Sequence, residues 1–327
     1  MRGEFDLIAR YLAPLSTGAP GAFGLTDDGA VLPGAGGPTR VLTLDTLVAG
    51  THYLPADPAD LVARKALRVN LSDLAAMGAR PEGYLLSLAL AADTPESWVA
   101  TFAEGLRTDQ GVYGVALLGG DTTGTGGPTT VAVTALGRTL ADGAVLRRNG
   151  ARPGDRVYIS GTIGDAALGL AIARGTVGGL AAADSQALIE RYRLPRPRVE
   201  LGAALCARGL ASAAIDVSDG LVADLGHICT HSGVAVELVL PRIPLSTAAQ
   251  RLVEVDQHHL RTALTGGDDY ELAFTAPPAN ADALAALARS LDLQLTCIGE
   301  VVAGDGVVVR DPEGRPMAFD HGGWTHF

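Results

Sequence analysis

Short acidic motifs recur along the whole 327-residue chain, each beside an apolar run typical of a strand or a helix. Carboxylates at the ends of such elements can converge on one point in a folded chain. Hard oxygen ligands with no histidine or cysteine beside them suit Mg²⁺, and a cluster of Mg²⁺ ions in turn indicates bound phosphates. The motifs are Thr26-Asp27-Asp28-Gly29, Leu44-Asp45-Thr46, Asn70-Leu71-Ser72-Asp73, Gly119-Gly120-Asp121-Thr122, Asp216-Val217-Ser218-Asp219-Gly220 and Gly266-Gly267-Asp268-Asp269-Tyr270.

The apolar periodicity predicts mixed helices and strands in two units. The first unit contains helices over 3–12, 60–77 and 95–110, and strands over 41–47, 85–90, 115–118 and 130–136. The second contains helices over 165–174, 183–193, 199–208, 221–232 and 281–291, and strands over 157–160, 213–215, 234–240, 272–275, 296–301 and 307–310. Hairpins mixed with crossovers indicate an α+β fold rather than a doubly wound sheet.

A polar, turn-rich segment separates the two units. It runs over 142–154 and carries Arg147, Arg148 and Arg152. We therefore place the domain boundary there, with one domain over 1–140 and a second over 141–327.

Charge excludes several classes of protein. The net charge is −11, the pI is near 5.0 and the sequence contains no basic block to neutralise phosphates, so we expect no nucleic-acid partner. Lys65 is the only lysine, and no Gly-Lys pair exists, which excludes a Walker A loop. Bound phosphates would instead be held by metals, arginines and backbone amides.

The remaining composition predicts a soluble, reduced protein. Cys206, Cys229 and Cys297 lie far apart in apolar contexts, which favours buried thiols over disulfides or a metal site. Glu4 and Asp6 interrupt any apolar run at the N-terminus, so we expect no signal peptide. No stretch reaches the length of a membrane span, and we expect a cytoplasmic location.

Each aspartate also has a structural interpretation. Asp73, inside an apolar helix, could be neutralised by an arginine or a nearby amide, and Asp219 could be a helix N-cap. Asp121 could belong to a plain turn, and the Asp27-Asp28 pair to an Asx turn. Asp45 is harder to explain in this way, because a strand interior disfavours aspartate unless it points into a site. The segment from Asp216 is not an EF-hand, since its twelfth position is His227 rather than glutamate.

Together the motifs resemble those of the thiamine-monophosphate kinase family, whose superfamily includes aminoimidazole ribonucleotide synthetase and selenophosphate synthetase. The resemblance covers nearly the whole chain. It is carried by Gly3-Glu4-Phe5-Asp6-Leu7-Ile8, Asp45-Thr46-Leu47-Val48 with His52, Asn70-Leu71-Ser72-Asp73-Leu74-Ala75-Ala76-Met77-Gly78, Gly119-Gly120-Asp121-Thr122-Thr123, Ile215-Asp216-Val217-Ser218-Asp219-Gly220-Leu221, Gly267-Asp268-Asp269-Tyr270-Glu271-Leu272 and Trp324.

The resemblance implies a two-domain aminoimidazole ribonucleotide synthetase-like α+β fold. It implies a homodimer in which the N-terminal domain binds ATP and Mg²⁺ and pairs its sheet with that of the partner. It also implies ATP-dependent phosphorylation of thiamine monophosphate to thiamine diphosphate, assisted by several Mg²⁺ ions. The implied metal ligands are Asp28, Asp45, Asp73, Asp121, Asp216 and Asp219; the nucleotide contacts are Gly120, Asp121, Arg148 and Ser218; and the substrate contacts are His52, Asp268 and Trp324.

The chain departs from the family pattern at three positions. Thr26 replaces a usual glycine, Leu44 replaces a small polar residue, and Asp268 replaces the more usual glutamate, which shortens its reach by one methylene. These changes affect substrate geometry more than the metal cluster.

The expected chemistry needs no general base, because the attacking phosphate oxygen is already anionic and the obstacle is repulsion between two polyanions. Metal-assisted transfer at Asp45, Asp73, Asp121 and Asp216 meets that obstacle. Three alternatives remain: a related enzyme with a different acceptor, a catalytically silent nucleotide or thiamine-phosphate sensor, and an acidic structural dimer.

Overall fold

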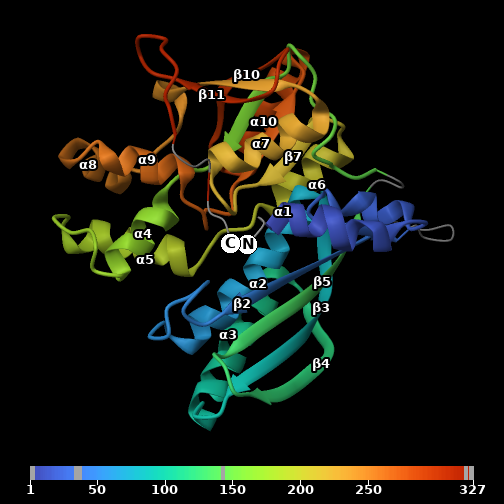
Figure 1. The fold of residues 1–327 in the computed structure, drawn as a ribbon, viewed down its shortest axis with the longest axis vertical. Helices are drawn as coiled ribbons and strands as arrows, with labels where there is room; N and C mark the ends of the chain where they lie inside the picture. The colour runs from blue at the N-terminus through green and yellow to red at the C-terminus, as the bar shows by residue number, and fades with distance from the viewer. Residues whose placement is uncertain (1–3, 33–38, 141–143, 320–322, 324–327) are drawn as a thin grey trace.

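The computed structural model describes residues 4–32, 39–140, 144–319 and 323. These residues form two α+β units, one above the other in Figure 1, with α2 (Ala59–Ala76) running between them. The segment between the units contains no helix or strand over residues 144–155. Of the described helices, none is both long enough and apolar enough to span a bilayer.

The first unit is built on a five-stranded sheet. Its strand order is β1 (Ala30–Leu32), β2 (Arg40–Val48), β5 (Thr130–Thr139), β3 (Ala79–Ala91) and β4 (Ala116–Thr125). Only the β3–β4 pair is parallel, and α3 (Glu96–Tyr113) supplies the crossover that a parallel pair requires. The predicted apolar stripe of α2, made by Leu67, Leu71 and Leu74, is completely buried in the core.

The predicted strand over 115–118 is too short and the turn interpretation of Asp121 is wrong, because β4 continues through the Gly119-Gly120-Asp121 segment to Thr125. A Cβ added at Gly120 would lie 1.9 Å from the carbonyl oxygen of Leu86 on β3. Glycine is therefore needed here for close strand pairing rather than for a turn. Asp121 lies inside an exposed edge strand.

The second unit is built on a six-stranded sheet. Its order is β11 (Gly306–Arg310), β8 (Ala235–Val239), β10 (Leu295–Val302), β6 (Arg156–Ser160), β9 (Leu272–Ala276) and β7 (Ala213–Asp216). Its helices are α4 (Asp165–Ala173), α5 (Ala182–Arg193), α6 (Val199–Ala207), α7 (Leu221–Ser232), α8 (Thr247–Val255), α9 (His258–Thr265) and α10 (Ala281–Ser290). The periodicity predicted all of these elements except α8 and α9, within a residue or two.

The N-terminal segment differs from the single helix predicted over 3–12. It contains the short α1 (Glu4–Leu7), the π-helical η1 (Ile8–Leu12), and the 3₁₀ segments η2 (Ala13–Ser16) and η3 (Pro20–Leu25). None of its described residues is fully buried. The short pieces are consistent with weak packing, because helices gain most of their stability from tertiary contacts.

The two units share one hydrophobic core, in which α6 packs against α2. A Cβ added at Gly202 on α6 would lie 1.9 Å from the carbonyl oxygen of Ala75 on α2, so the two helices approach closely. This contact holds the C-terminal half of α2 against the second unit. As predicted, the three cysteines are free thiols; Cys206 and Cys229 are buried and Cys297 is half-buried.

Candidate active site

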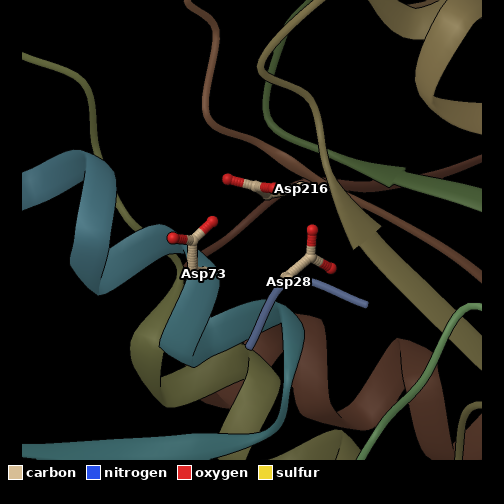
Figure 2. A group of neighbouring side chains, drawn as sticks. All are labelled: Asp28, Asp73 and Asp216. Carbon is tan, nitrogen blue, oxygen red and sulfur yellow. The ribbon is translucent and has the colours of Figure 1, made fainter. Parts of the chain in front are cut away.

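Three aspartates from distant parts of the chain converge where the two units meet. Asp28 precedes β1, Asp73 lies on α2, and Asp216 ends β7. Figure 2 shows the three carboxylates directed toward one another, and each offers an oxygen within 4.8 Å of the others. The predicted convergence of these three residues is therefore present in the structure.

Polar residues of strand β2 contact the same face of α2. The Thr43 hydroxyl donates to the Asp73 carboxylate, and the Asp45 amide donates to Asn70 Oδ1 at 3.0 Å. Asn70 in turn donates to the carbonyl of Ala66 at 2.9 Å. Asp73 is thus oriented by a neutral hydroxyl, and among the described residues no arginine neutralises it.

Burial perturbs the cluster strongly. The pKa of Asp73 is raised well above its ordinary value, mainly by burial and further by the charges of Asp45, Asp216 and Asp28. Burial, and then the charge of Asp28, raises the pKa of Asp216 from 3.8 to about 8. In both cases desolvation of the charged carboxylate is the larger cause, and repulsion between neighbouring carboxylates adds to it. The cluster is therefore poised to accept positive charge.

The donor set fits a hard divalent cation. Within the described parts of the chain, Asp28 Oδ2 and Asp216 Oδ2 are buried atoms with no hydrogen-bond partner. Native proteins rarely leave such atoms unsatisfied, and a metal ion is one usual explanation. The cluster offers carboxylate oxygens and no sulfur or imidazole ligand, which suits Mg²⁺.

Two arginines anchor the first acidic motif. Arg148 forms an ion pair with Asp28, and Arg147 bonds Asp27 through two nitrogens at 3.0 and 2.8 Å. Burial lowers the pKa of Arg148, but the charge of Asp28 outweighs it and the pKa is raised overall. Arg148 Nε is buried and has no partner among the described residues, so one donor of this side chain is unused.

Asp224, which the sequence analysis did not single out, holds the turn before α7. Its Oδ2 accepts from the amides of Ser218, Asp219 and Gly220, each at 3.0 Å. Gly220, rather than Asp219, occupies the N-cap position, so the N-cap interpretation of Asp219 is wrong. These three amides are engaged, and Ser218 can contact a ligand only through its hydroxyl or carbonyl. The sequence signal for Asp224 was its place in the first turn of the helix.

Lys65 was also missed as a site residue. Its ammonium lies 3.0 Å from Asp268 Oδ2 and 3.1 Å from the carbonyl oxygen of His52. The His52 ring is fixed separately, because its Nδ1 accepts from the amide of Val48 at 3.0 Å. The structure thereby brings together the two described residues of the predicted substrate end. The sequence signal for Lys65 was that it is the only lysine of the chain.

One pocket of about 670 Å³ contains both groups of residues. Its lining includes most of the predicted site: Asp28, Asp45, His52, Asp73, Arg148, Asp216, Ser218, Asp219 and Asp268. Glu4 and Phe5 of α1 and Leu170 and Arg174 at the end of α4 also line it. Trp324 lies outside the described residues.

Gly120 and Asp121 do not reach this pocket within one chain. Across the sheet, Asp121 is in register with Ser87, Ser87 with Ala132, and Ala132 with Thr46. Three strand spacings correspond to about 14 Å. Asp121 therefore cannot share a metal ion with Asp45 of the same chain.

Comparison with known proteins agrees with this architecture. The AIR synthase related protein family matches through its N-terminal domain over residues 26–139 and its C-terminal domain over residues 152–312. The chain is 44% identical to thiamine-monophosphate kinase of Caulobacter vibrioides, covering 99% of this chain and 90% of that protein. It is also 44% identical to thiamine-monophosphate kinase of Escherichia coli K12, covering 99% and 98%.

A solved structure gives the same result. AaThiL complexed with AMPPCP and TMP superposes with a TM-score of 0.85 and 32% identity, covering 100% of this chain and 99% of that one. The predicted two-domain α+β fold of the aminoimidazole ribonucleotide synthetase type is thus confirmed. The chain belongs to the thiamine-monophosphate kinase family of AIR synthase related proteins.

Proposed function

We propose that this protein transfers the γ-phosphoryl group of ATP to the phosphate of thiamine monophosphate, giving thiamine diphosphate and ADP. The observation that carries the proposal is the pocket that joins the Asp28–Asp73–Asp216 cluster to His52 and Asp268. A pocket with an acidic, metal-suited end and an organic-ligand end fits the reaction of the relatives, and AaThiL was solved with a nucleotide analogue and TMP.

The residues of the cluster would hold Mg²⁺ ions. Asp28, Asp73 and Asp216 supply the converging oxygens, while Asp45 and Asp219 line the same pocket and can add further ligands. Bound Mg²⁺ would neutralise the two phosphate groups and stabilise the transferring group. This set of ligands is large enough to hold several Mg²⁺ ions.

The transfer needs little proton chemistry from the protein. The bond between the γ-phosphorus and the β–γ bridging oxygen breaks, and a bond from an acceptor phosphate oxygen to that phosphorus forms, with ADP leaving. An in-line arrangement is expected for a direct transfer. The chain's own contribution is orientation: Arg148 and Ser218 line the pocket, where the guanidinium and the hydroxyl can bind a phosphate.

The opposite end of the pocket would hold the organic part of the acceptor. With its Nδ1 accepting from Val48, a neutral His52 carries its proton on Nε2 and can donate it in a hydrogen bond. Asp268 presents a carboxylate, which can accept a hydrogen bond from the amino group of thiamine. We place Trp324 at this end too, on the family resemblance alone.

Gly120 and Asp121 would reach the site from a second copy of the chain. Among the described strands, β4 pairs with β3 alone, so its outer edge is open, and Leu117 and Leu118 on it are exposed. An open edge with exposed leucines is suited to strand pairing with a partner. In such a homodimer each chain provides the metal cluster of one site and Asp121 of the other.

Subunit mixing tests the shared site. Asp73→Asn and Asp121→Ala proteins are each expected to be inactive. Random reassociation in equal amounts would restore about a quarter of wild-type activity, because half of the dimers are mixed and each mixed dimer has one intact site. Absence of any recovery, with mixed dimers demonstrated by mass spectrometry, would remove Asp121 from the partner's site.

The acceptor is tested with purified protein, Mg-ATP and a panel of compounds. Thiamine monophosphate is expected to support turnover, while unphosphorylated thiamine, aminoimidazole precursors and selenide do not. Turnover with another acceptor would indicate a related enzyme of the superfamily. Tight ATP binding with no turnover would indicate a sensor, and no effect of Mg²⁺ on stability would indicate a structural dimer.

A further inference from the structure

The only lysine of the chain, Lys65, is buried beside the acceptor end of the pocket. It lies on α2, two turns before Asp73. Its ammonium contacts Asp268 Oδ2 at 3.0 Å, the carbonyl oxygen of His52 at 3.1 Å and the face of the Tyr192 ring at 4.1 Å. An ammonium has three N–H donors, so these three partners satisfy it fully.

Lys65 contacts two residues that line the pocket but does not line the pocket itself. Its side chain is 4% exposed, whereas the side chain of Asp268 is 25% exposed and lines the pocket together with His52. A lysine this deeply buried is costly unless it is paired, so the position demands a defined partner. The contacts of Lys65 are thus with two pocket-lining residues and one buried ring.

The backbone of Asp268 is constrained as well. Its φ angle is +75°, in the left-handed region, and its amide donates to the carbonyl of Ser218 at 2.8 Å. Gly267 approaches the same carbonyl so closely that a Cβ would lie 2.1 Å from the oxygen. With the backbone fixed in this way, Lys65 determines where the carboxylate points.

We propose that Lys65 is a positioning residue that sets the affinity of the site for the organic part of the acceptor. It directs one oxygen of Asp268, holds the backbone of His52, and neutralises Asp268 so that this carboxylate acts as a hydrogen-bond acceptor for the ligand rather than as a metal ligand. This inference rests on the proposed function, because it assigns Asp268 and His52 to acceptor binding.

Lys65→Met tests the inference, since methionine has similar length and no charge. The KM for thiamine monophosphate is expected to rise about tenfold, while the KM for ATP changes less than about twofold, because only acceptor contacts are loosened. Arg64→Met is the matched control: Arg64 is the preceding residue on α2, and it pairs with Asp109 at 2.9 Å away from the pocket. It should leave both KM values unchanged.

A double-mutant cycle separates positioning from general stability. If Lys65 acts through Asp268, adding Lys65→Met to Asp268→Asn should raise the KM for thiamine monophosphate far less than it does in the wild-type background. Fully multiplicative effects would overturn the proposal. So would a folded Lys65→Met protein with unchanged KM values, or one in which both KM values rise together.

The remaining outcomes are also decisive. If Lys65→Met does not fold, Lys65→Arg keeps the charge but carries a larger planar head that displaces Asp268, and the same selective rise is expected; an unchanged KM would overturn the proposal. Wild-type protein that makes no thiamine diphosphate would refute the proposed function itself. Wild-type turnover with unaffected Lys65 variants would refute only the role of Lys65.

Discussion

Removing one carboxylate from the cluster should stabilise the protein without Mg²⁺ and weaken its response to Mg²⁺. Asp73→Asn is the most informative change, because the half-buried Asp73 faces both Asp28 and Asp216. Two ionised carboxylates whose oxygens lie within 4.8 Å of each other repel by at least about 3 kcal/mol at an effective dielectric constant of 20. Protonation already relieves part of this repulsion, since the pKa values of Asp73 and Asp216 are raised.

We therefore expect the metal-free variant to gain about 1–3 kcal/mol at pH 8, or for this 327-residue chain a Tm higher by roughly 1.5–4.5 °C. Wild-type protein should gain about 2.7 kcal/mol when Mg²⁺ is present at a hundred times its Kd, and the variant much less. The assay is thermal unfolding with chelator and then with Mg²⁺, alongside a turnover measurement, in which the variant should be inactive.

A buried aspartate elsewhere provides the control. Asp155 is buried outside the pocket, and its Oδ2 accepts from the backbone amide of Arg152 at 3.0 Å and from the Ser212 hydroxyl at 2.6 Å. Asp155→Asn should keep the wild-type response to Mg²⁺. A full wild-type response in Asp73→Asn, or near-normal turnover, would refute the electrostatic reasoning and the assignment of Asp73 as a ligand.

Three further predictions concern pH and the turns that shape the pocket. The pKa of Asp216 is raised from 3.8 to about 8 in the folded protein, so protonated Asp216 contributes to the free energy of unfolding at low pH, and this contribution is lost as the pH rises. The Tm of metal-free protein should therefore fall between about pH 4 and pH 8. Saturating Mg²⁺ should flatten this profile. Asp224→Ala leaves three amides without their acceptor and should cost about 2–4 kcal/mol in chemical unfolding and weaken ATP binding in calorimetry; unchanged ATP affinity would contradict this role. Gly267→Ala forces a Cβ against Ser218 and should lower kcat/KM for thiamine monophosphate at least about tenfold, whereas Gly226→Ala, with open space around its Cβ, should not; equal effects would show that the close approach is unimportant.

Local patterns predicted most of the fold because they depend on neighbouring residues. The helix now seen as α2 and the strand containing Asp45 followed from apolar periodicity, and Asp45 and Asp73 both line the pocket. The glycines beside Asp121 were misassigned, since Gly-Gly is compatible with a turn or with close strand pairing. Only the position of the neighbouring strand, whose Leu86 carbonyl oxygen lies against Gly120, distinguishes close strand pairing from a turn.

The remaining site features depend on contacts between distant residues. Lys65 meets Asp268 across 203 positions of the sequence, and no periodicity links them. Asp224 was hidden for a different reason: an acid in the first turn of a helix is common, and its engagement of the preceding turn depends on the backbone path there. The separation of Asp121 from the cluster required the strand order, which local patterns do not specify.

The most direct test of the account is the yield of thiamine diphosphate relative to ADP, measured by chromatography after incubation of the purified protein with ATP, thiamine monophosphate and Mg²⁺. The account predicts equal amounts of the two products and neither product when Mg²⁺ or thiamine monophosphate is omitted. ADP formed without thiamine diphosphate, or product formed equally well in the presence of a chelator, would contradict it.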